Sequence, residues 1–188
     1  MIRIGITGSL ASGKTTASKI LANKRGPLFS ADKEVKELYK NRSFRSLISK
    51  KFKVQNDNRI KILLKEKILN SKRNLKKLEK IIHPLVRKKM KQFTQKNKNK
   101  KILFYEIPLL IESKLMGFFN VIIFIKSKKK VRLKRFISKK GDKKLFNLLN
   151  SKQLSDQKKI KHCDYVVVNE KNIKILKNKL LSIINRHG

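Results

Sequence analysis

Residues 8–15 read Gly-Ser-Leu-Ala-Ser-Gly-Lys-Thr, a glycine followed after four residues by Gly-Lys-Thr. Isoleucines alternate just before this stretch, at Ile2, Ile4 and Ile6, as in a strand, and residues 16–22 follow with the composition of a helix. A strand that runs into a glycine-rich turn and then a helix gathers backbone N–H groups and a helix N-terminus around one point, where phosphate oxygens bind. This pattern predicts a phosphate-binding loop.

Each residue type in the loop has a chemical reason. Gly8 and Gly13 can adopt positive φ and let the main chain wrap closely around a polyphosphate. Lys14 would reach the β- and γ-phosphates, and the Thr15 hydroxyl would bind Mg²⁺. The predicted nucleotide-binding residues are Gly8, Ala11, Ser12, Gly13, Lys14, Thr15 and Thr16.

Two further apolar runs end on an acid. Residues 28–32 are predicted as a short strand that ends at Asp32, and residues 102–106 as a buried strand that ends at Glu106. In open parallel sheets the ligand crevice lies at the carboxyl ends of the strands, so Asp32 would face the phosphate loop; the alternative is an N-cap of the following helix. Glu106 is a candidate for holding Mg²⁺, directly or through water, and its alternative is a capping or salt-bridging carboxylate.

Residues 42–100 are helical by pattern and form too large a block for one crossover between strands, so we expect a cap beside the nucleotide. Within it, Pro84 is predicted to open a helix, which would leave His83 at or next to the N-cap. Arg87 lies four residues from His83, on the same helix face. A histidine and an arginine together suit an anion, although a lone histidine is more often structural.

Residues 121–125, which are all apolar, and residues 165–169, which are apolar up to Asn169, predict two more strands, and residues 173–184 predict a final helix. Between the two strands, a basic stretch runs from Arg132 through Arg135 and Lys139 to Gly141. This stretch is either a solvated helix face or a lid that brings a cation over a transferring phosphoryl group.

The 51 lysines and arginines outnumber the 12 acids and give a net charge of +39. This excess would ordinarily indicate nucleic acid, but it is spread along the whole chain with abundant Asn and Ile, as A/T-rich codons would produce. We expect no specific nucleic-acid partner. Cys163 is the single cysteine, and no signal peptide or membrane-spanning run is apparent, so we expect a cytosolic protein with no membrane partner, a monomer or weak homo-oligomer.

Several motifs in one order resemble the dephospho-coenzyme A kinase family. They are Gly5-Ile6-Thr7-Gly8 with the phosphate loop, Ala31-Asp32, Leu78-Glu79, His83-Pro84-Leu85-Val86-Arg87, Pro108-Leu109-Leu110-Ile111-Glu112, Gln153 and Asp164-Tyr165-Val166. The resemblance covers residues 4–169. It implies a kinase that uses ATP and Mg²⁺ to phosphorylate the 3′-hydroxyl of the adenosine ribose of dephospho-coenzyme A.

The resemblance also implies roles. Catalysis is expected of Asp32 as the base or orienting group for the ribose hydroxyl, with Lys14 and Arg135 stabilising charge; Asp32, His83, Arg87 and Leu109 are expected to bind the acceptor, and Thr15 and Glu106 the metal. Three positions depart from the family: Ser30 replaces a frequent Asp, Glu106 replaces a common Asp, and Lys139 replaces a usual Arg. A lysine cannot offer the bidentate fork of an arginine, which puts the lid chemistry at that position in doubt.

The expected fold is α/β: a three-layer P-loop nucleoside-triphosphate hydrolase-like domain with a five-stranded parallel sheet, a helical acceptor-binding insertion and a lid. The expected core spans about residues 1–31, 101–126 and 160–188, the insertion about 32–100, and the lid about 127–159. The alternatives are another nucleoside or nucleotide kinase with the same loop, and a basic nucleic-acid-binding protein with a vestigial loop.

Overall fold

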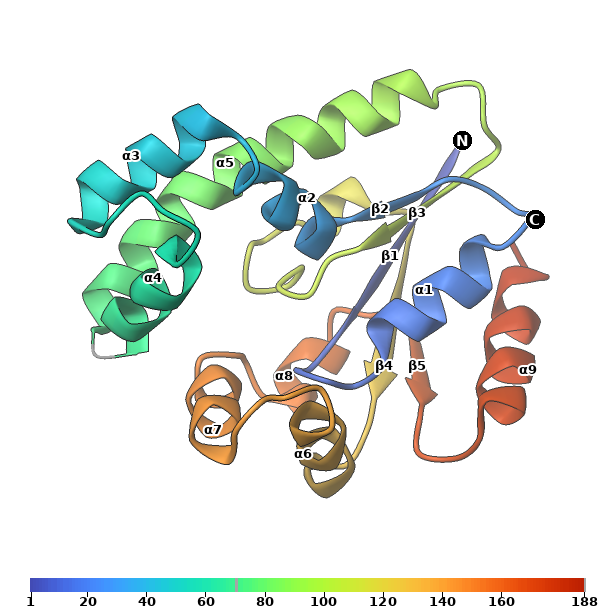
Figure 1. Ribbon diagram of the computed structural model, residues 1–188. Coiled ribbons are helices and arrows are strands. Elements are labelled where there is room, and N and C mark those ends of the chain that lie inside the picture. Colours follow the sequence, from blue (N-terminus) through green and yellow to red (C-terminus); the bar gives the residue numbers. More distant parts are fainter. Residues whose placement is uncertain (70, 188) are drawn as a thin grey trace. The chain divides into compact units, whose positions relative to one another are not determined.

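The computed structural model describes residues 1–69 and 71–187. It divides into two compact units (Figure 1): residues 1–30 with 94–188 form the first, and residues 31–93 the second. In the described part of the chain, no helix is long and apolar enough to cross a membrane.

The first unit is built on a parallel sheet, which has five strands among the described residues. Its strands are β1 (Ile2–Gly8), β2 (Leu28–Ser30), β3 (Ile102–Glu106), β4 (Val121–Lys126) and β5 (Tyr165–Val168). Their order is β2-β3-β1-β4-β5, which puts β1 in the middle. The register pairs Gly8 with Ile125 and Ile6 with both Glu106 and Ile123, so the ends of the three central strands meet at one edge.

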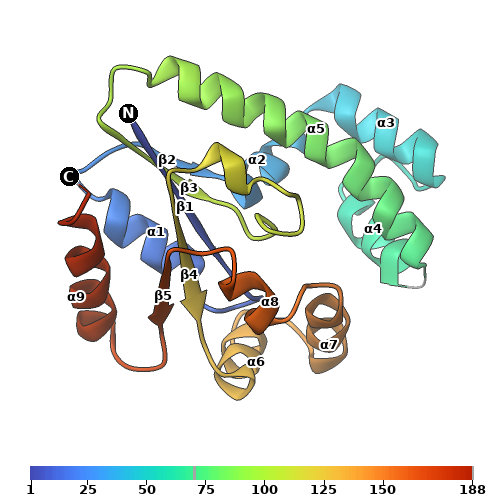
Figure 2. The same cartoon turned by 180° about the vertical axis from the view of Figure 1, so that it is seen from behind.

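Two helices cover one face of this sheet (Figures 1 and 2). They are α1 (Lys14–Ala22) and α9 (Ile173–Ile184). Their apolar sides pack with Ile4, Ile6 and Ile123 in one buried core, as the alternating pattern of β1 predicts. Gly5 points to the opposite face, where a side chain in its place would meet Leu110 and Phe119 from the connection between β3 and β4.

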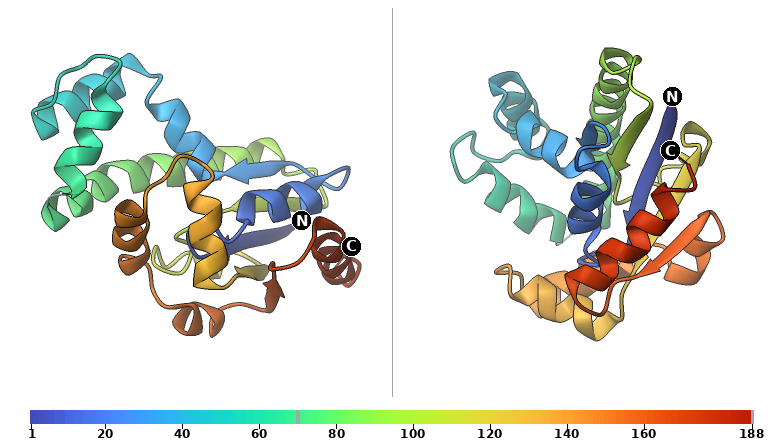
Figure 3. Two further views of the ribbon diagram at one scale, coloured as in Figure 1. Left: turned by 60° about the horizontal axis from the view of Figure 1, so that its bottom comes forward. Right: turned by 90° about the vertical axis from the view of Figure 1, so that its right-hand side faces the viewer.

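The connection between β4 and β5 consists of three helices. These are α6 (Lys129–Ile137), α7 (Lys143–Ser151) and α8 (Asp156–Ile160). Asp142 caps α7 by accepting a hydrogen bond from the Leu145 amide, and Ser155 caps α8. A short 3₁₀ helix, η1 (Met116–Phe118), precedes β4. Figure 3 shows α6 to α8 from two further directions.

The second unit is entirely helical. It contains α2 (Ala31–Leu38), α3 (Arg42–Phe52), α4 (Ile60–Leu69) and most of α5 (Lys72–Lys96). A separate apolar core holds it together, formed by Phe44, Ile48, Phe52, Val54, Ile60 and Leu64, with Leu78, Ile82 and Leu85 of α5 packed against them.

Two local predictions were wrong. Strand β2 ends at Ser30, and Ala31 already begins α2, so Asp32 lies in the first turn of a helix instead of at a strand end. Pro84 lies inside α5 and opens no helix, so His83 is not near a cap. Proline removes one helical N–H, but the apolar side of α5 packs against the core both before and after it, and this packing holds the helix through the proline.

Candidate functional site

The loop between β1 and α1 has the backbone that its glycines predicted. Gly8 has a φ of 150° and Gly13 a φ of 98°, both disfavoured for residues with a Cβ, and Ala11 also has a positive φ of 58°. A Cβ on Gly8 would meet the carbonyl oxygen of Ile125, so no larger residue fits between the loop and β4. Gly13 is the N-cap of α1, which places the positive end of that helix at the loop.

Lys14 and Ser12 present polar groups inside the loop. The Lys14 side chain is buried, and its Nζ donates to the Ser9 carbonyl oxygen at 2.9 Å. Ser12 is fully buried, and its Oγ has no hydrogen-bond partner among the described residues. Buried hydroxyls nearly always have a partner, so this one fits an anion bound in the loop.

A buried carboxylate lies next to the loop. Glu106, at the end of β3, is 2% exposed. Its Oε1 accepts a hydrogen bond from the Thr15 hydroxyl at 2.5 Å, and its Oε2 accepts one from the Ser30 hydroxyl at 2.9 Å. An adjacent hydroxyl and carboxylate form an oxygen donor set of the kind that Mg²⁺ prefers. The neutral Ser30 thus fills its place beside Glu106 without adding a second negative charge.

Three side chains from the far end of the chain hold the loop carbonyls. The Ser12 carbonyl oxygen accepts hydrogen bonds from Asn169 Nδ2 at 2.8 Å and from Arg135 Nη1 at 3.3 Å. Arg132 Nη1 donates to the Leu10 carbonyl oxygen at 3.2 Å. Burial lowers the pKa of Arg132, and the negative charge of nearby Asp156 partly offsets this decrease. Arg135 therefore lies against the loop.

The residues expected to bind the acceptor fall in different places. Leu109 lies in the turn that follows β3, within the first unit, and is half-buried. Asp32, in the first turn of α2, and His83 and Arg87, both in α5, belong to the second unit. His83 and Arg87 are four residues apart on one continuous helix, so they share a face.

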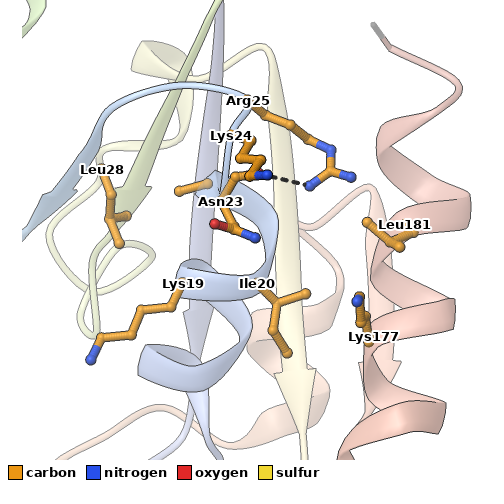
Figure 4. A pocket seen from close by; sticks show the side chains of 9 residues that line it. Lys19, Ile20, Asn23, Lys24, Arg25, Leu28, Lys177 and Leu181 are labelled. Atoms are coloured by element: carbon orange, nitrogen blue, oxygen red, sulfur yellow. Dashed lines mark hydrogen bonds between the residues drawn. The ribbon is translucent and has the colours of Figure 1, made fainter.

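A basic hollow lies at the other end of α1 (Figure 4). It is lined by Lys19, Ile20, Ala22, Asn23, Lys24, Arg25, Leu28, Lys177 and Leu181. Because these residues surround the C-terminal half of α1 and the side of α9, the hollow is separate from the phosphate loop at the N-terminus of α1. It contains no glycine-rich backbone and no carboxylate.

Sequence reasoning assigned no site role to Ser30 and Asn169, which the structure places beside Glu106 and Gly13. Asn169 is the last residue of a predicted strand and directly follows the observed β5, and the rule that polar residues at parallel strand ends face the ligand crevice would have identified it. Ser30 gave no comparable signal, because the predicted strand extended past it to Asp32.

A parallel sheet of this strand order, with a glycine-rich loop between its central strand and a helix, defines a P-loop nucleotide-binding protein. The loop lysine, the following threonine and the buried acid beside it are the parts that phosphoryl-transferring members of this class use.

The model of the dephospho-CoA kinase family matches residues 2–174. A dephospho-CoA kinase from Bartonella quintana is 34% identical over 186 residues, covering 96% of this chain and 95% of its own. A dephospho-CoA kinase from Fusobacterium nucleatum is 35% identical over 182 residues, covering 94% of each chain. The chain belongs to the dephospho-CoA kinase family, as its motifs predicted.

Solved structures share the fold. A dephospho-CoA kinase from Campylobacter jejuni superposes with a TM-score of 0.65 at 24% identity and covers 99% of this chain and 97% of its own. A Thermus thermophilus protein, TT1252, gives a TM-score of 0.81 at 22% identity, covering 100% and 98%. A shikimate kinase from Acinetobacter baumannii gives 0.56 at 14% identity, covering 99% and 92%. These likenesses confirm the predicted P-loop α/β fold.

Proposed function

We propose that this protein transfers the γ-phosphoryl group of MgATP to the 3′-hydroxyl of the adenosine ribose of dephospho-coenzyme A, giving coenzyme A. Membership of the dephospho-CoA kinase family supports the reaction and the acceptor. The observation that carries the ATP half is the loop itself, in which Lys14, the unpartnered Ser12 hydroxyl and the N-terminus of α1 lie together.

The loop binds the triphosphate through its backbone amides, and Lys14 exchanges its contact with the Ser9 carbonyl for the β- and γ-phosphates. Thr15 and Glu106 hold Mg²⁺, with Glu106 acting directly or through water. When bound, the metal neutralises charge on the phosphate oxygens. Arg135 releases the Ser12 carbonyl and stabilises charge on the transferring group.

The second unit supplies the acceptor side. Asp32 orients or deprotonates the ribose hydroxyl, and His83 and Arg87 bind the anionic groups of dephospho-coenzyme A, together with Leu109 from the first unit. Helices α6 and α7 form the lid that excludes water. Little covalent work is needed from the protein, since phosphoryl transfer depends mainly on positioning and charge stabilisation.

An ADP-release assay with dephospho-coenzyme A as acceptor tests this proposal. We expect MgATP-dependent ADP release that is saturable in dephospho-coenzyme A and lost in Lys14→Ala. Nucleosides and mononucleotides, tested at equal concentration, should be poor acceptors. Turnover with a nucleoside and none with dephospho-coenzyme A would identify a different P-loop kinase.

The charge of +39 calls for a separate control. Adventitious binding of DNA or RNA should weaken steeply as salt rises, because it depends on counterion release. Tight binding of one defined nucleic acid at physiological salt, without kinase activity, would refute the proposal.

A further inference from the structure

The peptide groups of Leu10 are held from both sides. The Leu10 amide donates to Gln153 Oε1 at 3.0 Å, and its carbonyl oxygen accepts from Arg132 Nη1 at 3.2 Å. Arg132 is in the first turns of α6, and Gln153 lies two residues past the end of α7. One loop residue is therefore bonded to both ends of the α6–α7 segment.

These two ends are also bonded to each other. Arg132 Nη1 donates to Asn150 Oδ1 at 2.7 Å, and Arg132 Nε donates to the Ser127 carbonyl oxygen at 3.1 Å. Asn150 is in the last turn of α7, and Ser127 directly follows β4. The Arg132 guanidinium thus connects the start of α6 to the end of α7 and is also hydrogen-bonded to the loop.

Gln153 is in turn held by a buried ion pair. Lys159 has no exposed surface, and its Nζ lies 2.7 Å from Glu112 Oε1 and 3.5 Å from Gln153 Oε1. Glu112 Oε1 also accepts from the Leu154 amide at 3.2 Å. Since both neighbours of the Gln153 amide oxygen are donors, the orientation of this amide is fixed.

A second bond secures the same turn of the loop. The Ser9 hydroxyl donates to Asp156, in the first turn of α8. Ser9 also provides the carbonyl oxygen on which the Lys14 ammonium rests. Residues 153–159 therefore hold two consecutive loop residues, Ser9 and Leu10, through hydrogen bonds.

We propose that Gln153, fixed by the Glu112–Lys159 pair, is a positioning residue of the ATP site that, together with Arg132, couples the conformation of the phosphate loop to the order of the α6–α7 segment. The proposal rests on the proposed ATP-binding function. A loop that tightens on a triphosphate pulls on both ends of α6–α7 through the Leu10 peptide groups. Arg135, which lies on α6, then approaches the phosphate in step with ATP binding.

The test compares three glutamine variants. Gln153→Leu removes the acceptor of the Leu10 amide, Gln153→Glu keeps an oxygen for both donors, and Gln157→Leu changes an exposed glutamine of α8 as the matched control. ATP affinity is measured by calorimetry without acceptor. We expect Gln153→Leu to raise the Kd about tenfold, because a partly buried donor is left unsatisfied. Gln153→Glu should stay within about threefold, and Gln157→Leu should match the wild type.

Hydrogen exchange distinguishes a positioning role of Gln153 from a purely structural one, because a structural role would not change the protection that ATP induces. Saturating ATP should slow amide exchange across residues 138–151 in the wild type and in Gln157→Leu, and much less in Gln153→Leu. In steady-state kinetics, Gln153→Leu should raise KM for ATP more than KM for dephospho-coenzyme A.

Unchanged ATP affinity in a folded Gln153→Leu protein would overturn the proposal. So would equal rises in both KM values with full ATP-induced protection of residues 138–151, which would show that Gln153 only stabilises the fold. If Gln153→Leu does not fold, Gln153→Asn, which withdraws the oxygen by one methylene, decides by the same criteria. A wild type that binds no ATP would instead refute the proposed function.

Discussion

Replacing Ser30 by Asp tests how the charge of Glu106 is balanced. The Ser30 hydroxyl donates to Glu106 Oε2 at 2.9 Å, and Glu106 is almost fully buried. An aspartate in this place would turn a donor–acceptor contact into two neighbouring carboxylates. We expect Ser30→Asp to fold less stably at pH 7 without Mg²⁺ and to recover stability when the metal binds.

The magnitude follows from the geometry. Two carboxylates whose charges lie about 4 Å apart repel each other by about 4 kcal/mol at an effective dielectric constant of about 20. Partial protonation and side-chain rotation relieve part of this repulsion, so we expect a loss of about 2–4 kcal/mol in the free energy of unfolding. Repulsion raises the pKa of the introduced aspartate in the folded state. The native protein then binds more protons than the unfolded chain, and stability falls as pH rises from about 4, the pKa of an unfolded aspartate.

Urea unfolding of Ser30→Asp and Ser30→Asn, each with and without Mg²⁺, isolates the charge, because the two side chains have nearly the same shape. We expect the difference between the variants to vanish below about pH 4, where the introduced aspartate is protonated, and to shrink at pH 7 on adding Mg²⁺. Equal stability of the two variants at pH 7 without metal would show that the repulsion is relieved elsewhere, and would refute this account of Ser30.

Asp32→Asn should lower turnover about 10²-fold with ATP affinity little changed, as for a positioned base. A decrease of only a few-fold in a stopped assay would show that Asp32 stabilises the start of a helix and has no catalytic role. Arg87→Ala should raise KM for dephospho-coenzyme A more than KM for ATP, and equal rises would indicate a role in the fold. Burial raises the pKa of the Cys163 thiol to about 12, so a thiol reagent should label the native protein at pH 8 far more slowly than the urea-unfolded protein. The thiol stays neutral in the native state but ionises in the unfolded chain from about pH 9, so it should also lower stability as pH rises from 9 to 12; fast native labelling would contradict both expectations.

The strands could be predicted because each strand of the first unit is a short apolar run that ends at a polar or turn residue, whereas their order in the sheet comes from the structure alone. Helix α9 was equally plain from its buried stripe. The errors occurred where local chemistry is ambiguous. Ala31 and Asp32 suit either a strand end or a first helical turn, and a proline such as Pro84 is commoner at a helix start than inside a helix. Packing against the second core decided the latter case, and no local pattern contains that information.

The phosphate loop was predictable because its contacts are local: Gly8, Gly13, Lys14 and Thr15 act within one turn of chain. The side chains that hold the loop from outside were not predictable in this way. Gln153 and Asn169 lie more than 140 residues along the chain from the loop residues to which they are hydrogen-bonded. Only the parallel topology brings the ends of β4 and β5 to the same edge of the sheet as the end of β1, and the spacing of such residues along the chain carries no signal. The motif resemblance included Gln153 but gave no physical reason for it.

Lys159 shows where reasoning from composition stops. An excess of lysine driven by codon usage is tolerated on solvated faces, where one more ammonium group changes stability little. A lysine introduced at a fully buried position would place a charge in a medium of low dielectric constant. This would lower the free energy of unfolding by several kcal/mol unless a partner compensates the charge. Lys159 has such partners, Glu112 and the oxygen of Gln153. A compositional drift cannot place a lysine there by itself, because Glu112 and Gln153 lie on two other segments and must be present together with it. The scattered lysines and Lys159 therefore need different explanations. Only Lys159 is connected to the phosphate loop, through its contact with Gln153, which in turn accepts from the Leu10 amide.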